Sequence, residues 1–203
     1  TYQGVVTSPA AGSTEQFPLI VDVPDLTLRG ALSMKLNRRG RATGESTTGL
    51  ESTLAAAEPM PIVSDIISIP IIAVDAHPSG SAGNGFTVQG FRFLSGHDPA
   101  VDSGGQAVLS VRATRLTIRG NRIEGGFTEK FDIRGGSADV LQNYAEGNGV
   151  TCDVCLAGPG RFRASGNTVI DGGIPGIGVS GVIDFPTPDG IEPLDIPAAA
   201  ETW

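Results

Sequence analysis

The sequence predicts an all-β solenoid, in which short coils of about 22–24 residues stack on one another and pair their strands in parallel. Three observations lead to this fold class. Glycine and proline supply 29 and 14 of the 203 residues, so regular elements are short and often interrupted. Short apolar segments recur along the chain in one pattern, and three asparagines follow them at intervals of 22 and 24 residues. Strands spaced in this way do not suit a hairpin meander, which needs tight two-residue turns.

The recurring segments alternate inward-facing and outward-facing residues, because side chains alternate between the two faces of a strand. The first expected inward column is Leu26, Phe86, Leu116, Ala138 and Phe162. The second expected inward column is Leu28, Val88, Ile118, Val140 and Ala164. The expected outer column between them is Thr27, Thr87, Thr117, Asp139 and Arg163. Five segments that agree in a two-residue period predict strands stacked in register.

Three asparagines, Asn121, Asn143 and Asn167, occupy equivalent positions in successive units. We expect them to stack at a bend as a structural ladder, in which each side-chain amide bonds to the coils above and below. Asparagine also tolerates the left-handed backbone conformation that a sharp bend requires. The alternative interpretation is that they are three unrelated turn residues.

The spacing, the alternating columns and the asparagines together resemble the right-handed parallel β-helix of the pectate-lyase-like family, over about residues 17–184. The resemblance implies a right-handed coil of roughly six to eight turns. We expect one domain over residues 1–185 and a Pro/Ala-rich tail over residues 186–203.

Several segments interrupt this pattern. Residues 33–61 are polar and irregular and predict an excursion from one coil, within which Leu50–Glu58 has the composition of about two helical turns. Pro70 splits the apolar run Ile62–Val74; because proline cannot donate to a sheet, this run predicts two strands around a corner. A second excursion is expected at about residues 95–105.

Cys152 and Cys155 are separated by two residues. Such a pair is typical of a thioredoxin-like redox motif or of half a zinc site. However, the redox motif belongs on a helix, and neither His77 nor His97 stands at ligand spacing. We favour a structural role for the two cysteines, either as small side chains in the wall of the coil or as partners in a disulfide.

The charge balance restricts the partners. The chain has 22 acidic and 14 basic residues, a net charge of −8, and only two lysines. This composition argues against nucleic-acid binding, which needs a basic patch for phosphates. No stretch approaches the roughly 18 apolar residues of a transmembrane helix. The same composition favours an exported protein that is periplasmic, cell-surface or secreted.

Stacked coils turn equivalent positions into surface columns, with neighbours about 4.8 Å apart. Three such columns can be read beside the asparagines. One contains Arg92, Arg122, Tyr144 and Thr168; a second contains Glu124, Glu146 and, shifted by one extra residue, Asp171; a third contains Arg119, Leu141 and Ser165.

The acidic column is the strongest candidate for a catalytic or cation-binding site. Stacked carboxylates raise one another's pKa, bind a cation such as calcium, or recruit arginine. They would suit a glycoside hydrolase or a polysaccharide lyase, with Glu124, Glu146 and Asp171 as candidate catalytic or calcium-binding residues. Arg92, Arg119, Arg122 and Tyr144 are the candidate residues for binding an acidic polysaccharide. The alternative is a solvated face in which Arg122 pairs with Glu146.

The family resemblance favours binding over catalysis. Polygalacturonase-like members carry an Asn-Thr-Asp signature, whereas Asn167 and Thr168 are followed here by Val169. The Asp-Asp signature is absent, and the nearest histidine motif is Gly96-His97-Asp98. We therefore expect a non-catalytic exported scaffold or binding module that contacts a polysaccharide, the cell envelope or a partner protein. Because solenoids need capped ends, we also expect either a longer parent protein or a partner at the N-terminal edge.

Overall fold

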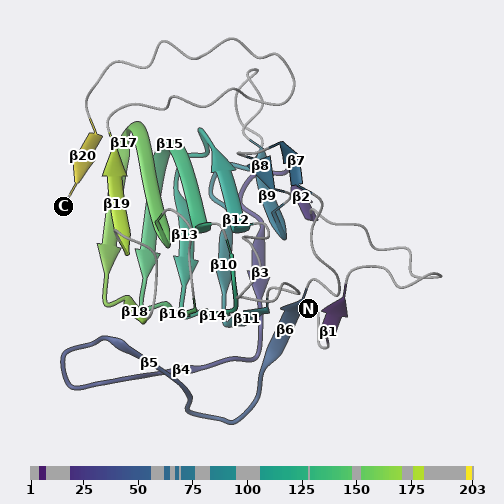
Figure 1. Cartoon of the computed structure of the whole chain (residues 1–203), viewed down its shortest axis with the longest axis vertical. Coiled ribbons are helices and arrows are strands. Elements are labelled where there is room, and N and C mark those ends of the chain that lie inside the picture. Colours follow the sequence, from purple (N-terminus) through teal and green to yellow (C-terminus); the bar gives the residue numbers. More distant parts are fainter. Residues whose placement is uncertain are drawn as a thin grey trace.

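The computed structural model describes residues 5–7, 19–55, 62–64, 67–68, 70–75, 83–94, 106–127, 129–147, 152–170, 176–180 and 200–202. Within these ranges the regular secondary structure consists of β-strands and contains no helix, which confirms the all-β class (Figure 1). The two helical turns expected within Leu50–Glu58 are wrong. Residues Ser52–Ala55 form a strand instead, because pairing with a neighbouring strand and burial of Leu54 outweigh a weak helix propensity.

The first sheet has six strands, and every pairing in it is parallel. Its order is β1, β6, β11, β14, β16 and β18. The bounds are Val5–Thr7, Ser52–Ala55, Phe91–Leu94, Arg122–Glu124, Tyr144–Glu146 and Thr168–Ile170. Its strands are three or four residues long, as the frequent glycines predict.

The second sheet has ten strands and covers two sides of the molecule, because β15 (Glu129–Leu141) and β17 (Val154–Ser165) are long and bend. Their first halves belong to one stack, in which neighbours pair in the order β2 (Leu19–Val21), β9 (Ile72–Asp75), β12 (Gln106–Val111), β15, β17 and β19 (Ile177–Ser180). Their second halves belong to another stack, in which neighbours pair in the order β3 (Thr27–Arg29), β10 (Thr87–Gln89), β13 (Leu116–Arg119), β15, β17 and β20 (Ala200–Thr202). The six-stranded sheet is the third stack.

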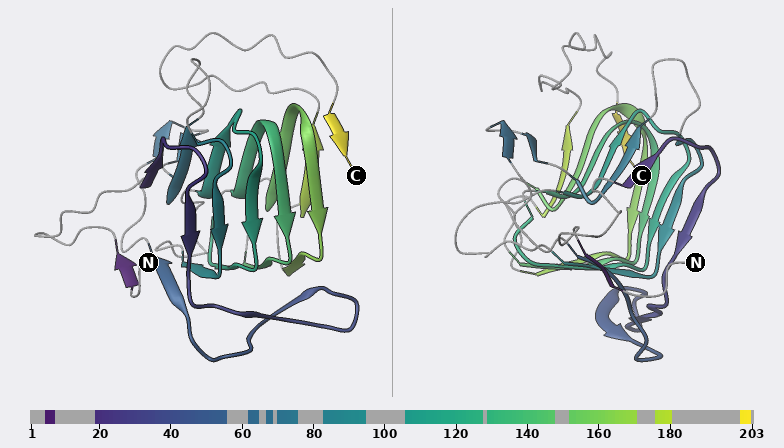
Figure 2. Two further views of the ribbon diagram at one scale, coloured as in Figure 1. Left: turned by 180° about the vertical axis from the view of Figure 1, so that it is seen from behind. Right: turned by 90° about the vertical axis from the view of Figure 1, so that its right-hand side faces the viewer.

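The chain visits these three strand stacks in a fixed order. Strands β9, β10 and β11 are followed by β12, β13 and β14, and each member of the second group pairs in parallel with its equivalent in the first. In the view along the stack, equivalent strands lie one behind another (Figure 2). The bend in β15 requires glycine: Gly136 has φ +80°, and a Cβ there would lie 2.0 Å from the Ala113 carbonyl oxygen.

The core lies between the three stacks, and the predicted inward columns form part of it. Leu28, Val88, Ile118, Val140 and Ala164 are successive Cα partners across the strands. Phe86, Leu116 and Phe162 of the first column are almost fully buried. Leu26, Leu28 and Ala164 are only partly buried, because they belong to strands near the ends of the stack.

The three asparagines form a ladder at the corner between β13, β15 or β17 and the following short strand. Asn121 N donates to Asn143 Oδ1 (3.0 Å), and Asn143 N donates to Asn167 Oδ1 (2.9 Å). The Nδ2 atoms of the three side chains donate to the carbonyl oxygens of Val88, Ile118 and Val140 respectively. Each side chain therefore bonds the backbone of a neighbouring unit, which is the arrangement that the spacing predicts.

The left-handed conformation expected of the asparagines is wrong. It belongs to the residue before each of them: Gly120 (φ +61°), Gln142 (φ +55°) and Gly166 (φ +67°). The asparagine amides are committed to the backbone of the next unit, and the preceding residue makes the bend. Glycine is favoured there because it adopts positive φ at little cost.

Residues 33–61 contain an antiparallel hairpin of β4 (Met34–Leu36) and β5 (Ala42–Ser46). The hairpin is attached to the stack: Ala42 N donates to the Gly166 carbonyl oxygen (2.9 Å), and Thr168 Oγ1 donates to the Ala42 carbonyl oxygen (2.7 Å). Figure 1 shows it extending along the stack, below β14, β16 and β18 in that view. The described part of the predicted excursion, residues 33–55, therefore contains a hairpin that is attached to the stack.

The apolar run at 62–74 contains more strands than expected. β7 (Ile62–Ser64) and β8 (Ile67–Ser68) pair antiparallel, and β9 begins after Pro70. In the tail, β20 pairs in parallel with β17. The predicted excursion at 95–105 and the rest of the tail lie outside the described residues.

We expect Asn143→Ala to lower the free energy of unfolding by about 2–4 kcal/mol, because the Asn121 N–H and the Ile118 carbonyl lose buried partners. Urea denaturation measures this change. Ser165→Ala, at an exposed position of the adjacent strand, is the matched control and should change the free energy by less than about 0.5 kcal/mol. Equal effects of the two variants would contradict a stabilising ladder.

Candidate functional site

The outer face of the six-stranded sheet carries the first predicted column. Arg92, Arg122, Tyr144 and Thr168 are successive Cα partners in β11, β14, β16 and β18. The intervening residue Ile123 is buried in the core, so alternation directs the charged side chains outward.

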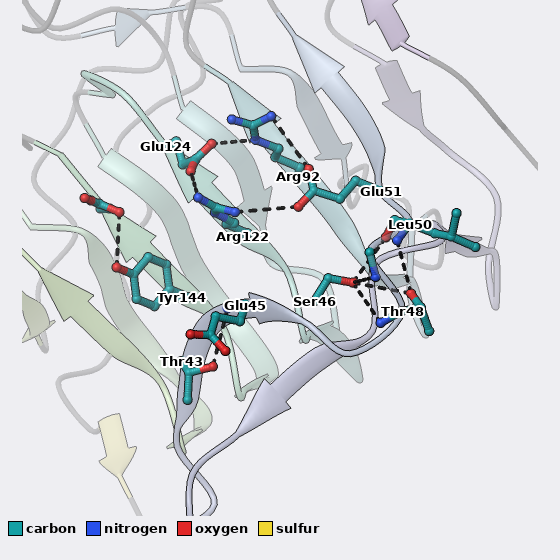
Figure 3. Close-up of polar contacts among 12 residues, drawn as sticks. Thr43, Glu45, Ser46, Thr48, Leu50, Glu51, Arg92, Arg122, Glu124 and Tyr144 are labelled. Atoms are coloured by element: carbon teal, nitrogen blue, oxygen red, sulfur yellow. Dashed lines mark hydrogen bonds and ion pairs between the residues drawn. The ribbon is translucent and has the colours of Figure 1, made fainter.

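The two arginines of this column are neutralised by two glutamates (Figure 3). Glu124 accepts from Arg92 Nε (2.5 Å) and also pairs with Arg122 Nη2. Glu51 lies 3.6 Å from both Arg92 Nη1 and Arg122 Nη1. Two positive and two negative charges thus form a closed network with no net charge. Sequence reasoning missed Glu51 because the residues that follow it were expected to be helical. They form a strand in which Thr53 is the Cα partner of Arg92, and Glu51, two residues before Thr53, therefore lies on the same face.

The acidic column differs from the prediction in its third member. Glu124 and Glu146 are Cα partners, but the residue opposite Glu146 in β18 is Ile170. Asp171 lies outside the described residues, and the shift that would bring it into line with Glu146 is wrong. Tyr144 and Thr168 are paired without a bulge, so the extra residue of that unit lies elsewhere.

Glu146 accepts a hydrogen bond from a side chain of its own strand. The Tyr144 hydroxyl donates to Glu146 Oε2 (3.1 Å), and partial burial together with this carboxylate raises the pKa of Tyr144. Arg122 pairs with Glu124 and Glu51, so the alternative pairing of Arg122 with Glu146 is wrong. The described residues contain no group of three or more acidic, histidine or cysteine side chains that could hold a metal ion.

The third column borders a groove. Arg119, Leu141 and Ser165 are Cα partners as predicted, and the register extends to Gln89 and Arg29 in the preceding strands. Between these strand ends and the β4–β5 hairpin lies a cavity of about 420 Å³. Its polar lining includes Arg29, Gln89, Arg119 and Gln142, and its apolar lining includes Met34 and Leu36.

The hairpin is held close to the first column by Gly44. A Cβ on Gly44 would lie 2.8 Å from Cζ of Tyr144, and Gly44 has φ +80°. Glycine therefore allows β5 to lie directly on the tyrosine ring. The hairpin is supported at this contact and at Gly166, which fixes the wall of the groove.

A second group of ionisable residues is buried on β15 and at the start of β17, and sequence reasoning did not single it out. Lys130 pairs with Asp153, and both side chains are fully buried; Lys130 Nζ also donates to the Gly147 carbonyl oxygen (2.8 Å). Arg134 Nε donates to Asp132 Oδ2 (2.9 Å). The alternation of Lys130, Asp132 and Arg134 was visible in the sequence, but it predicts an outer face and carries no signal of burial.

Burial dominates the behaviour of Asp132. Loss of solvation raises the pKa of its carboxyl to about 7, against the opposing effect of Arg134, and nearby Glu129 raises it further. Perturbed carboxylates of this kind occur at functional sites and also in structural ion-pair clusters.

Cys152 and Cys155 form a disulfide, and the described residues contain no free cysteine. Cys155 is the Cα partner of Asp132 in the neighbouring strand. Of the two states left open by the sequence, the disulfide is therefore present.

Comparison with known protein families, with curated proteins and with solved structures found no match to this chain. In the described residues, no helix has the length and apolar character needed to cross a membrane.

We expect Asp132 to make stability fall as pH rises from about 4 to about 7. In this range the folded state keeps a proton that the unfolded chain releases, because the folded pKa is raised. The contribution is at most about 4 kcal/mol. Urea denaturation of wild type and Asp132→Asn at pH 4.5 and pH 7.5 measures it, and the wild type should lose stability relative to the variant at the higher pH. Parallel pH profiles would contradict a raised pKa.

Proposed function

We propose that this chain is a right-handed parallel β-helix of the pectate-lyase-like kind that serves as a non-catalytic, exported binding module for a polysaccharide. The fixed order in which the chain visits three stacks of parallel strands supports the β-helix. Stacked units generate long, regular surfaces, and such surfaces suit an extended polymer with its own repeat.

The observation that carries this proposal is the state of the stacked carboxylates. Cleavage of a glycosidic bond by acid–base chemistry needs one carboxyl group that donates a proton and a second that acts as base or nucleophile. Glu124 is held by two arginines, and Glu146 accepts from Tyr144. These contacts favour structurally engaged carboxylates over a catalytic pair.

Two further observations support the remaining parts of the proposal. Disulfides persist in oxidising compartments, so the Cys152–Cys155 bond supports export. The outer columns present Thr27, Thr87 and Thr117 in register along the stack. Hydroxyl groups repeated in this way offer hydrogen bonds to successive sugars of a chain.

We expect wild-type protein to bind a polysaccharide without degrading it. Retention on immobilised acidic and neutral polysaccharides measures binding, and release of reducing ends or unsaturated products, with and without calcium, measures turnover. Glu146→Gln is the informative variant, and Glu45→Gln on the exposed hairpin is its matched control. Turnover that disappears only in Glu146→Gln would overturn the non-catalytic proposal in favour of a lyase or hydrolase.

A further inference from the structure

We propose that the groove between the β4–β5 hairpin and the ends of β3, β10 and β13 binds a short segment of an anionic glycan, with carboxylate or sulfate-ester groups held by Arg29 and Arg119. This inference rests on the proposed function and assigns it a site and a ligand chemistry. The site is separate from the Arg92–Arg122 network.

The positive charge of the groove favours an anionic ligand. Within the described residues, Arg92 and Arg122 face glutamates, Arg115 pairs with Asp25, and Arg134 pairs with Asp132. Arg29 and Arg119 are exposed and have no carboxylate partner there, and the groove lining contains no acidic residue. In a chain of net charge −8, two uncompensated guanidinium groups in one groove provide a local site for anions.

The spacing of Arg29 and Arg119 suits a linear ligand. Arg29, Gln89 and Arg119 are successive Cα partners, so the two arginines stand two strand spacings apart, about 10 Å. A linear ligand can place one oxyanion near each arginine, and Gln89 between them can exchange hydrogen bonds with the hydroxyl groups of the ligand.

Side chains of the groove are already oriented for a ligand. Arg119 Nε donates to Gln142 Oε1 (3.3 Å), which orients the guanidinium and leaves its terminal nitrogens for a ligand. Met34 and Leu36 form an apolar wall against which the C–H face of a sugar ring can pack. A volume of about 420 Å³ matches the size of small-ligand sites and suits a segment of a few sugars.

The hairpin turn extends the positive surface. Arg38, Arg39 and Arg41 are exposed, and no described carboxylate pairs with them. Two hydrogen bonds support the turn, because Asn37 Oδ1 accepts from the backbone N–H groups of Arg39 (2.9 Å) and Arg41 (3.1 Å). A polyanionic chain that leaves the groove along the hairpin would meet these arginines.

The test measures binding of the full chain to dextran, dextran sulfate and polygalacturonate at low and physiological salt by biolayer interferometry. Dextran and dextran sulfate share a backbone and differ in charge, and polygalacturonate supplies carboxylates in place of sulfates. The variant is Arg29→Gln/Arg119→Gln. The matched control is Arg115→Gln/Arg161→Gln, which removes the same charge from exposed positions outside the groove lining and outside the threonine column. Thermal melts establish that all proteins are folded.

We expect the wild type to bind at least one of the two charged polymers, with affinity that falls as salt increases. The groove variant should bind at least about tenfold more weakly, and the control variant should stay within about twofold of wild type. The polymer that binds identifies the oxyanion as sulfate or carboxylate.

Other outcomes overturn the inference in distinguishable ways. Equal losses in the two double variants would show that net charge, and not the groove, drives binding. Equal binding of dextran and dextran sulfate would overturn the anionic ligand and leave the polysaccharide-binding function supported. Absence of binding to all three polymers and to neutral plant and bacterial polysaccharides would overturn both proposals.

Discussion

The register between stacked strands is the constraint on which the rest of the structure depends. A shift of one residue would turn every inward side chain outward, and a shift of two would separate the charged columns from their partners. The asparagine ladder opposes both shifts, because each buried amide bonds to backbone atoms of a neighbouring unit. The core columns and the ladder therefore specify the same alignment.

Parallel stacking in register places like charges beside one another, and the chain handles this in two ways. On the six-stranded sheet, adjacent Arg92 and Arg122 repel, and Glu51 and Glu124 compensate them from both sides. Each of these partly exposed pairs contributes little alone, about 0–1 kcal/mol, but together they leave no free charge. At the groove, Arg29 and Arg119 are separated by Gln89 and receive no such compensation from the part of the chain that the structure describes. This difference between the two faces is the reason to place ligand binding at the groove.

The parts of the fold that depend on a repeat could be predicted from the sequence. The columns through Thr27, Thr117 and Arg163 and the positions of the three asparagines follow from alternation and from intervals of 22 and 24 residues. The misplacement of Asp171 has a physical reason, because an extra residue in a unit can be accommodated before or after the paired segment, and the pattern alone does not distinguish these cases. The bend was also assigned to the asparagines instead of the residue before each of them. The repeat pattern does not distinguish the residue whose side chain forms the ladder from the neighbouring residue that turns the chain.

Features that depend on contacts between distant segments could not be predicted. Glu51 reaches its arginines across about 40 and 70 residues of sequence, and the hairpin rests on Tyr144 and Gly166 without any repeat to mark it. The burial of Lys130 and Asp132 on a face that alternation assigns to solvent has no sequence signal either. The groove is built from the repeat and the hairpin together, so only half of its lining follows from periodicity.

The most direct test of this account is a cross-linking measurement of strand register. Thr117 and Asp139 are Cα partners on adjacent strands, at a separation that a disulfide can bridge. Mild oxidation of Thr117→Cys/Asp139→Cys, followed by peptide mass spectrometry, should give a 117–139 cross-link in high yield. The offset pair Thr117→Cys/Leu141→Cys should give little. A higher yield from the offset pair would contradict the register from which the ladder, the charged columns and the groove all follow.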